Sequence, residues 1–451
     1  MAPGGRRRRP TGWLILIDAA AVAAAYGLAL LTRFLGTPPA YNEHALLGAL
    51  PLVVLAAVVL AQVYGLYEER QPPWPEQVQS LFLLAALNAV VAMAASFFVR
   101  SFGVPRSVIA LAAVNTFLIL YAYRRVLYRR WERVIGVPAL VLLHVGPAAG
   151  VAAAAADTMP FKLVGDFNCE GLGAGAVVAT AREVVREHRA SGLLLDQTLP
   201  GQLKEDVALL ALEGGLDLFV VPRLLDLLLL QSRPRAWDGR LVIEVAPSGR
   251  GYQQILKRFI DISLSVLFLT ITLPVLLPAL ALVAAEDGWP VLYRQERVGR
   301  NGRRFTLIKI RTMVRDAEAA TGPVLASAAD PRATRVGRWL RQLHLDEVPQ
   351  LWNVLRGEMS LVGPRPERPS LHDAAVARVP HFATRLHVLP GLTGLAQVQG
   401  DYHTLPQEKL KFDTLYALRS SAALDAQIIL RTARTILAGL ARLFHLRRRS
   451  S

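Results

Sequence analysis

Apolar runs dominate the first part of the chain. A helix needs about 20 predominantly apolar residues to cross a membrane; the first three runs reach this length and the fourth is shorter. The first run follows the basic segment Arg6–Arg9, but it is too long for a cleaved signal peptide and lacks a clear cleavage site. We therefore predict four spanning helices, at Trp13–Leu35, Ala45–Leu66, Val78–Val99 and Val108–Tyr123.

Two polar residues interrupt these runs, Asp18 and Asn88. Polar side chains inside membrane helices commonly hydrogen-bond to neighbouring helices, and they also line substrate paths. We favour helix–helix hydrogen bonds, with a substrate path as the alternative.

A fifth apolar run, Ile260–Val283, contains Pro274 and Pro278 in its second half. Proline removes a backbone donor and bends a helix. Basic residues lie on both sides of the run, and the positive-inside rule disfavours carrying either cluster across the membrane. We predict a re-entrant hairpin over residues 257–285 that breaks at the two prolines. A true span with an extracellular C-terminal domain is the alternative.

Between the fourth and fifth runs, short apolar segments alternate with helical patterns, which is typical of a parallel sheet. The loop after the first strand, Gly146–Gly150, lacks the middle glycine of a dinucleotide-binding loop and has Pro147 after the first glycine. We therefore expect a non-catalytic Rossmann-like domain. The predicted strands are Ala139–Val145, Leu193–Leu195 and Leu218–Val221, and the predicted helices are Thr180–His188 and Gln202–Glu213.

The last pattern, Leu424–Leu446, has apolar residues at helical spacing with arginines between them. Such a helix suits the interface of an anionic membrane leaflet, and a helix that contacts a protein partner is the alternative. The expected domains are 1–134 (four-helix membrane domain), 135–248 (Rossmann-like domain) and 249–451 (α/β domain with the re-entrant hairpin and interfacial helices).

Composition agrees with a membrane protein. Hydrophobic residues make up 53% of the 451 residues, and the net charge is +16. Beside so many apolar runs, this charge indicates anionic lipid and phosphate rather than nucleic acid. Cys169 is the single cysteine, which excludes an intramolecular disulfide and a cysteine-based zinc site. Arginines precede the first run and follow the fourth, so we expect both flanks in the cytoplasm.

Candidate chemistry lies in the final domain. Adjacent acids, Asp346 and Glu347, stand just before Pro349, which is tolerated in the first turn of a helix but not in its interior. Acids at that position often cap the helix. The same pair beside many arginines also fits phosphoryl transfer, with one carboxylate attacking phosphorus and the other helping to hold a divalent metal. The residues alone leave both readings open.

Arginine is suited to phosphate because its guanidinium donates two hydrogen bonds in a fork. Basic residues cluster around the re-entrant hairpin and the acid pair, and one stands between prolines after a tight turn. The candidates for phosphate binding are Arg297, Arg300, Lys309, Arg311, Arg341 and Arg365.

Several ordered motifs in this domain resemble the bacterial sugar transferase family, the monotopic polyprenyl-phosphate hexose-1-phosphate transferases. The four-helix and Rossmann-like parts resemble its long form, the undecaprenyl-phosphate galactose or glucose phosphotransferase type. His344 is a departure, since the family commonly has Ser or Thr there. The motifs are Tyr293–Gly302, Lys309–Met313, Leu345–Leu351, Asn353–Pro366 and Pro390–Gln397.

The resemblance implies a ping-pong reaction. Asp346 would be the nucleophile on the β-phosphate of a UDP-hexose, with release of UMP, and undecaprenyl phosphate would then take the hexose-1-phosphate. Glu347 would be the partner of Asp346 at Mg²⁺, and Arg341 would contact phosphate. The expected location is the bacterial inner membrane, with the catalytic domain in the cytoplasm, at the first membrane step of exopolysaccharide, capsule or O-antigen synthesis.

Two other functions compete with this hypothesis. A non-catalytic membrane scaffold for polysaccharide assembly would suit the first two domains but would not need the acid pair. A nucleotide-sugar dehydratase or epimerase would need an intact glycine loop and a Tyr-x-x-x-Lys pair in the middle domain, which has no tyrosine. The size of the membrane unit is compatible with a homodimer.

Overall fold

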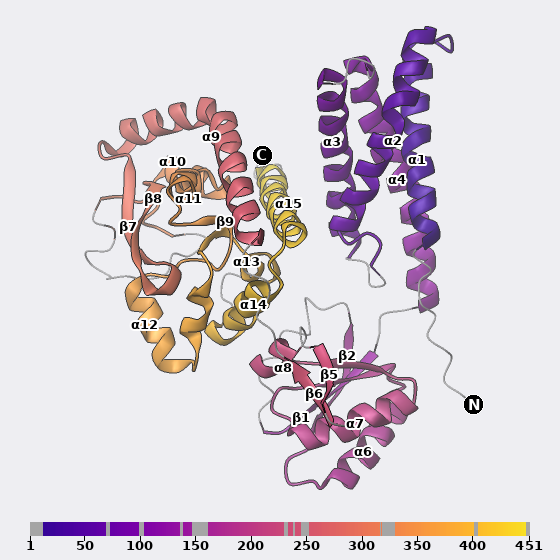
Figure 1. Cartoon of the computed structure of the whole chain (residues 1–451), viewed down its shortest axis with the longest axis vertical. Helices are drawn as coiled ribbons and strands as arrows, with labels where there is room; N and C mark the ends of the chain where they lie inside the picture. The colour runs from indigo at the N-terminus through magenta and orange to yellow at the C-terminus, as the bar shows by residue number, and fades with distance from the viewer. Residues whose placement is uncertain are drawn as a thin grey trace. The chain divides into compact units, whose positions relative to one another are not determined.

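The computed structural model describes residues 12–68, 73–98, 103–135, 139–146, 161–229, 233–237, 240–244, 252–315, 317, 330–400 and 405–447. The chain divides into two compact units, Met1–Arg223 and Leu224–Ser451. Figure 1 shows the elements of both units along the chain.

The four predicted N-terminal helices are confirmed. Small residues such as Ala25 and Ala29 are fully buried between them, whereas large apolar side chains such as Leu16 (72% exposed) face outward. This arrangement is typical of helices that pack closely in lipid. The fourth helix continues past the predicted end through a basic segment. The helices are α1 (Gly12–Arg33), α2 (Ala40–Val63), α3 (Trp74–Phe98) and α4 (Arg106–Ile135).

Both polar residues noted in these helices bond to other helices. The Asp18 carboxylate pairs with the Arg124 guanidinium, which also donates to the backbone oxygen of Leu66 at 3.2 Å. The Asn88 amide donates to the oxygen of Val53 at 2.8 Å and accepts from the Tyr26 hydroxyl at 3.1 Å. These bonds join α1, α2, α3 and α4 through side chains that are buried in the helix bundle.

The predicted parallel sheet is confirmed, with the strand order β2-β1-β3-β4. The interior residues of the central strand, Leu140–Leu143, are completely buried, which explains their uniformly apolar sequence. Of the four strands in this sheet, β2 was not predicted, because its sequence lacks a clear apolar run. The rest of the glycine loop after Gly146 lies outside the described residues. The elements are β1 (Ala139–His144), β2 (Lys162–Asn168), α6 (Ala174–Glu187), β3 (Gly192–Leu195), α7 (Gly201–Glu213) and β4 (Asp217–Val220).

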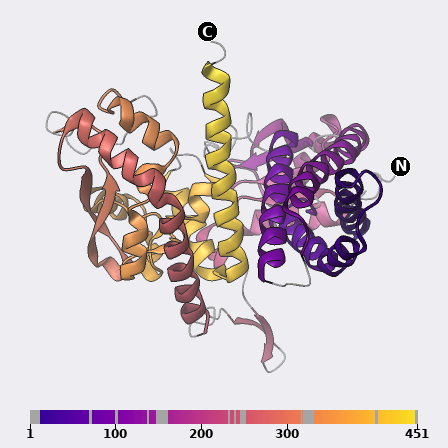
Figure 2. The same cartoon turned by 90° about the horizontal axis from the view of Figure 1, so that it is seen from above.

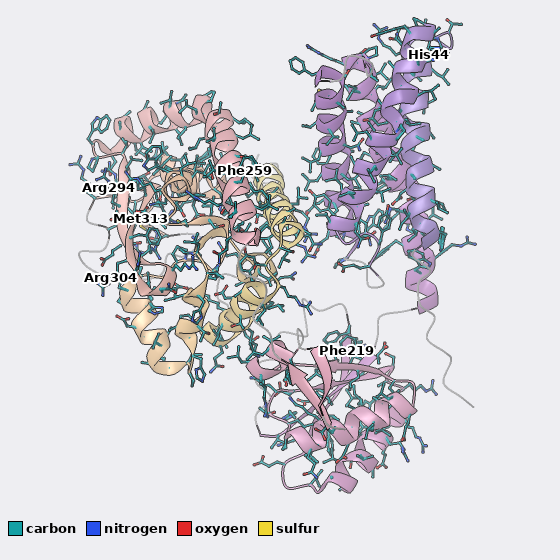
Figure 3. All side chains as sticks on the ribbon, viewed as in Figure 1. His44, Phe219, Phe259, Arg294, Arg304 and Met313 are labelled. Atoms are coloured by element: carbon teal, nitrogen blue, oxygen red, sulfur yellow. The ribbon has the colours of Figure 1, made fainter. Side chains whose placement is uncertain are left out.

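The fifth apolar run forms one long helix, α9 (Tyr252–Asp287), that continues through Pro274 and Pro278. Figures 1 and 2 show that α9 changes direction sharply along its length. Its first limb carries exposed apolar side chains such as Phe259 (68% exposed; Figure 3). Together with α1 to α4, it makes five helices in the described chain that are long and apolar enough to cross a membrane.

Both ends of α9 are attached to the same α/β domain. Near its start, Arg258 donates to the backbone oxygens of Val354 and Leu355 at 2.6 and 2.8 Å. At its other end, the oxygens of Asp287 and Gly288 accept from Arg311 at 2.8 and 2.6 Å. A straight helix of 36 residues would separate its ends by about 54 Å, so the bend is what allows both attachments.

The rest of this domain contains an antiparallel hairpin and a short parallel pair of strands. The hairpin is β7 (Leu292–Val298) and β8 (Arg304–Ile310), and the parallel pair is β9 (Ser360–Val362) and β10 (Gly391–Thr393). The final helix α15 begins with apolar residues that pack in the domain core, where Ile428 is 1% exposed. Part of the predicted amphipathic face therefore covers this domain itself. A separate hairpin, β5–β6 (Arg233–Trp237 and Arg240–Glu244), follows α8 (Leu224–Leu229).

The elements of the α/β domain after α9 are β7 (Leu292–Val298), η2 (Arg300–Gly302), β8 (Arg304–Ile310), α10 (Arg335–Gln342), η3 (Leu345–Glu347), α11 (Gln350–Arg356), β9 (Ser360–Val362), α12 (Pro369–Arg378), η4 (Phe382–His387), β10 (Gly391–Thr393), α13 (Leu395–Gln399), α14 (Pro406–Arg419) and α15 (Ala422–Arg447).

Candidate active site

The acid pair lies in the short helical turn η3, between α10 and α11. His344, just before it, has a left-handed backbone conformation with φ of 54°, which His adopts more readily than most side chains. This residue turns the chain so that Asp346 faces inward and is only 8% exposed. His344, at which the resembling family commonly has Ser or Thr, therefore lies at a sharp backbone turn.

Helix capping does not explain the two acids. The residue that caps α11 is Pro349, and no side chain makes a capping hydrogen bond there. By contrast, α10 has an ordinary cap, in which the Thr334 hydroxyl accepts from the backbone N–H of Gly337 at 2.9 Å. The capping interpretation of Asp346 and Glu347 is therefore wrong.

Glu347 is held by two cations. Its Oε1 accepts from Lys309 Nζ at 2.9 Å and from an Arg365 guanidinium nitrogen at 2.7 Å. Burial opposes its ionisation, but Arg365 and Lys309 together hold the pKa of Glu347 far below its ordinary range. Glu347 is therefore an anion at every pH near neutrality.

Asp346 is in the opposite electrostatic situation. Burial, and then repulsion by the Glu347 carboxylate, raise its pKa to about 6, against the attraction of Lys309, His344 and Arg341. No hydrogen bond to its carboxylate occurs within the described part of the chain. Two adjacent carboxyl groups thus have separated pKa values, a pattern common where such groups have different chemical roles.

Arg365 lies in a backbone segment in which every carbonyl oxygen accepts a hydrogen bond. The segment Pro364–Glu367 follows β9, and its four successive carbonyl oxygens each accept a hydrogen bond from a different residue. Free rotation of this segment is thereby prevented, so the Arg365 side chain starts from a defined position. The donors are the backbone N–H of Gly391 (2.9 Å), the Arg385 guanidinium (2.9 Å), the Arg297 guanidinium (3.1 Å) and the backbone N–H of Val298 (3.0 Å).

A small cleft lies beside Lys309 and Arg365, the two cations that bond to Glu347. Its walls combine basic and apolar side chains, so it presents hydrogen-bond donors to whatever enters. Burial, followed by the charges of Arg365 and Arg368, lowers the pKa of Arg297 to about 10, and Arg297 is still a cation at neutral pH. The lining residues are Arg297, Leu307, Lys309, Gln350, Arg365 and Pro366.

The structure groups only some of the predicted phosphate ligands. Arg297, Lys309 and Arg365 line the cleft, and Arg341 lies near enough to Asp346 to affect its pKa while its Nε donates to the Thr312 hydroxyl at 2.8 Å. Arg311 is elsewhere: it is buried against the end of α9, where it contacts the Asp287 carboxylate at 3.1 Å.

Arg300 also lies apart from the acid pair. It is exposed in the turn between β7 and β8, and among the described residues it has no hydrogen bond or ion pair to Asp346 or Glu347. Arg294 and Arg304, on the two strands of the same hairpin, are likewise exposed (Figure 3).

The carboxylates of Asp346 and Glu347 suit a metal ion that is bound jointly by the protein and by a substrate phosphate. No cluster of three or more His, Cys, Asp or Glu side chains that could hold a metal occurs among the described residues. Mg²⁺ typically needs only one or two protein carboxylates and takes its other ligands from substrate phosphates and water. Lys309 and Arg365 both bond to Oε1 of Glu347, so its Oε2 and the Asp346 carboxylate are the oxygens that suit this mode.

Two residues at this site were absent from the sequence-based candidates. Gln350 is four residues after Asp346 in the same motif, so helical spacing could have indicated it. Arg385 is far from the acid pair in sequence and is connected to it through the Arg365 carbonyl. No local sequence signal points to Arg385.

Comparison with known proteins identifies the family. The family model described as Bacterial sugar transferase matches residues 252–439, a segment that contains the acid pair and its cations. The UDP-glucose:undecaprenyl-phosphate glucose-1-phosphate transferase of Caulobacter vibrioides is 42% identical over 188 residues, which are 40% of this chain and 69% of the relative. The chain belongs to the bacterial sugar transferase family.

Two further relatives extend the comparison. The undecaprenyl-phosphate glucose phosphotransferase of Komagataeibacter xylinus is 34% identical over 305 residues, 60% of this chain and 53% of the relative. The undecaprenyl-phosphate galactose phosphotransferase of Salmonella typhimurium is 36% identical over 202 residues, 41% of each chain. The chain thus spans about half the length of the Komagataeibacter xylinus relative. The names of these two relatives differ in the sugar, glucose in one and galactose in the other.

Proposed function

We propose that this sugar transferase moves a hexose-1-phosphate from a UDP-hexose to undecaprenyl phosphate, through a covalent intermediate on Asp346. The observation that carries the proposal is the separation of roles in the acid pair. Glu347 is neutralised by Lys309 and Arg365, whereas the carboxylate of Asp346 accepts no hydrogen bond from the described residues. The family and the names of its relatives support the general reaction, the transfer of a sugar phosphate to undecaprenyl phosphate.

The reaction has two steps. In the first, an oxygen of the Asp346 carboxylate forms a bond to the β-phosphorus of the UDP-hexose, while the bond from that phosphorus to the bridging oxygen breaks and UMP leaves. In the second, a phosphate oxygen of undecaprenyl phosphate attacks the same phosphorus and the Asp346 carboxylate is released. Arg365 and Lys309 place positive charge beside the reacting phosphate in both steps.

Asp346 and Glu347 would hold a Mg²⁺ ion, which would neutralise charge on the diphosphate of the donor. Lys309 and Arg365 keep Glu347 ionised even without a metal ion. Glu347 can therefore become a Mg²⁺ ligand without losing a proton. The pKa of Asp346, about 6, leaves its carboxylate largely ionised at neutral pH and therefore able to attack.

The bent helix α9 supports a re-entrant topology. Both of its ends are bonded to one domain, and its large exposed side chains between those ends are apolar. The exposed Trp339 and Trp352 on α10 and α11 suit the membrane interface, where tryptophan is enriched. The positive-inside rule and the cytoplasmic supply of UDP-sugars favour the cytoplasmic face of the inner membrane.

The middle domain has the strand order of doubly wound folds, which supports a Rossmann-like module. Its proposed role is non-catalytic. We further propose that the transfer initiates a surface polysaccharide, such as exopolysaccharide, capsule or O-antigen, and that the protein is a homodimer.

Replacing the nucleophile tests the reaction. Asp346→Asn should reduce UMP release at least ~10³-fold, since an amide does not displace the diphosphate and no covalent intermediate forms. The assay measures UMP release and protein-bound label from UDP-hexoses labelled in the sugar, with Mg²⁺ present and a panel of sugars. Asp373→Asn, at an exposed site on α12, is the matched control and should keep wild-type label. Wild-type turnover by the Asp346 variant would refute the assignment of the nucleophile. Absence of both UMP release and protein-bound label with the wild-type protein would instead favour a scaffold.

A further inference from the structure

Gln350 has a buried donor with no partner. It is the first residue of α11 and is 2% exposed. Its Nε2 is inaccessible to water and makes no hydrogen bond within the described residues. A buried donor without an acceptor typically destabilises a fold, so a position that retains one calls for an explanation.

A second unpartnered donor lines the same cleft. Arg297 uses its two terminal nitrogens on the oxygens of Pro366 (3.1 Å) and Gln295 (2.6 Å). Its Nε is buried and has no acceptor in the described part of the chain. Both groups can only donate, and the cations Lys309 and Arg365 line the cleft beside them. The complementary group is therefore an oxygen that carries negative charge.

A purely structural role does not account for Gln350. Asn353, one turn later on α11, is a buried amide with a structural role: it accepts from the Ile308 N–H at 3.2 Å and donates to the Thr306 oxygen and Glu358 carboxylate at 2.8 and 2.7 Å. These bonds fix α11 to β8. The Gln350 amide makes no comparable bond, although it lies on the same helix.

We propose that the Gln350 amide, together with Nε of Arg297, binds a non-bridging phosphoryl oxygen of the diphosphate in the sugar donor. This assignment rests on the proposed function for the identity of the donor. The cleft reaches Lys309 and Arg365, the residues that hold Glu347, so an oxygen bound there belongs to a phosphate next to the acid pair. Gln350 is thus a residue that binds the sugar donor.

The test separates binding from folding by comparing two amides on one helix. Gln350→Leu removes the N–H group that donates the hydrogen bond, and with it the unfavourable burial of an unpaired polar group. The melting temperature should therefore stay the same or rise. Its dissociation constant for UDP should increase roughly tenfold or more, which is typical of a lost hydrogen bond to a charged group. Gln350→Glu should weaken UDP binding further by repulsion. Asn353→Leu, the control, should instead lower the melting temperature.

Binding is measured on the full chain in detergent by titration calorimetry, with UDP and inorganic pyrophosphate as probes. Both should lose affinity in Gln350→Leu. Unchanged affinity for UDP, or a fall in melting temperature as large as that of Asn353→Leu, overturns the proposal. Loss of UDP affinity with unchanged pyrophosphate affinity also overturns it, because the amide would then contact the nucleoside.

The same titration distinguishes this proposal from the proposed function. If the wild type transfers sugar phosphate and Gln350→Leu has an unchanged KM and UDP affinity, the phosphoryl subsite is refuted and the reaction stands. If the wild type binds UDP through Gln350 but forms no covalent intermediate, the subsite stands and the reaction is refuted.

Discussion

At the scale of single residues, the chemistry depends on a contrast between two neighbours. Asp346 and Glu347 are adjacent in sequence and both are largely buried, yet their pKa values move in opposite directions. Lys309 and Arg365 cause the difference because both bond to Glu347 and neither bonds to Asp346. The local sequence is enough to locate the two acids. Their different pKa values become apparent only from the contacts of Lys309 and Arg365 with Glu347.

The raised pKa of Asp346 predicts a pH dependence. Protonation removes the nucleophile, so the rate of UMP release at low substrate should fall as the pH drops through about 6. Glu347 stays ionised throughout this range, since its pKa is lowered, and it does not contribute to the fall. A pH–rate profile of kcat/KM from pH 5 to 8 checks this; a flat profile between pH 5 and 7 would contradict it.

Changing Glu347 should move that profile. Repulsion by Glu347 is the second cause of the raised Asp346 pKa, after burial. Glu347→Gln removes this repulsion and should shift the acid limb to lower pH, while the maximal rate falls because Lys309 and Arg365 lose their anionic partner. The same kcat/KM profile measures the shift. An acid limb that moves upward or stays in place would show that Glu347 does not act on Asp346 electrostatically.

At the scale of elements, the Pro364–Glu367 segment connects the site to the rest of the domain. Arg385 on η4 bonds to its Arg365 carbonyl and pairs with Asp413 on α14 at 2.7 Å, and both charged side chains are only 2% exposed. Burial of a charge is tolerable only when it is paired. The packing of α14 against η4 therefore determines where Arg365 lies.

Breaking this pair should affect both stability and activity. Arg385→Gln leaves the Asp413 carboxylate buried without its partner, which should cost about 3–5 kcal/mol of folding free energy, and it frees the Arg365 carbonyl, so turnover should also fall. Thermal or denaturant unfolding and UMP release measure the two effects. Arg304→Gln, which breaks the exposed pair of Arg304 and Glu296, is the control and should change stability by less than about 1 kcal/mol. Equal effects of the two variants would refute the role of the buried pair.

At the scale of the whole molecule, the distribution of apolar surface organises the chain. Four helices expose large apolar side chains outward and bury small ones between them, and α9 exposes apolar side chains while both its ends bond to one domain. A bilayer accepts such helices because their backbone groups are satisfied internally. In the proposed re-entrant topology, α9 would hold the domain that carries the acid pair at the membrane surface.

The re-entrant topology predicts that both ends of α9 are reached from the same side of the membrane. In a Cys169→Ala background, single cysteines in place of the exposed Gln254 and Ala285 should react equally with an impermeant maleimide added to inside-out vesicles. A cysteine in place of the exposed Thr37, between α1 and α2, should react only in right-side-out vesicles. Opposite labelling of positions 254 and 285 would show that α9 spans the membrane.

The sequence by itself determined the features that depend on neighbours along the chain. Membrane helices follow from apolar runs because each satisfies its own backbone hydrogen bonds in lipid, and the acid pair was recognisable because its motif is contiguous. The central strand β1 was predictable for a similar reason, since it is apolar at every buried position.

Only the tertiary structure decided which charges meet. It bonds Arg365 and Lys309 to Glu347, attaches Arg311 to the end of α9, and brings Arg385 and Gln350 to a site that sequence spacing did not assign to them. The physical reason is that an arginine side chain can reach many partners, and the packing of distant elements selects among them. The unpaired donor of Gln350 becomes visible only when every neighbour is in place, because a missing partner is a property of the folded environment.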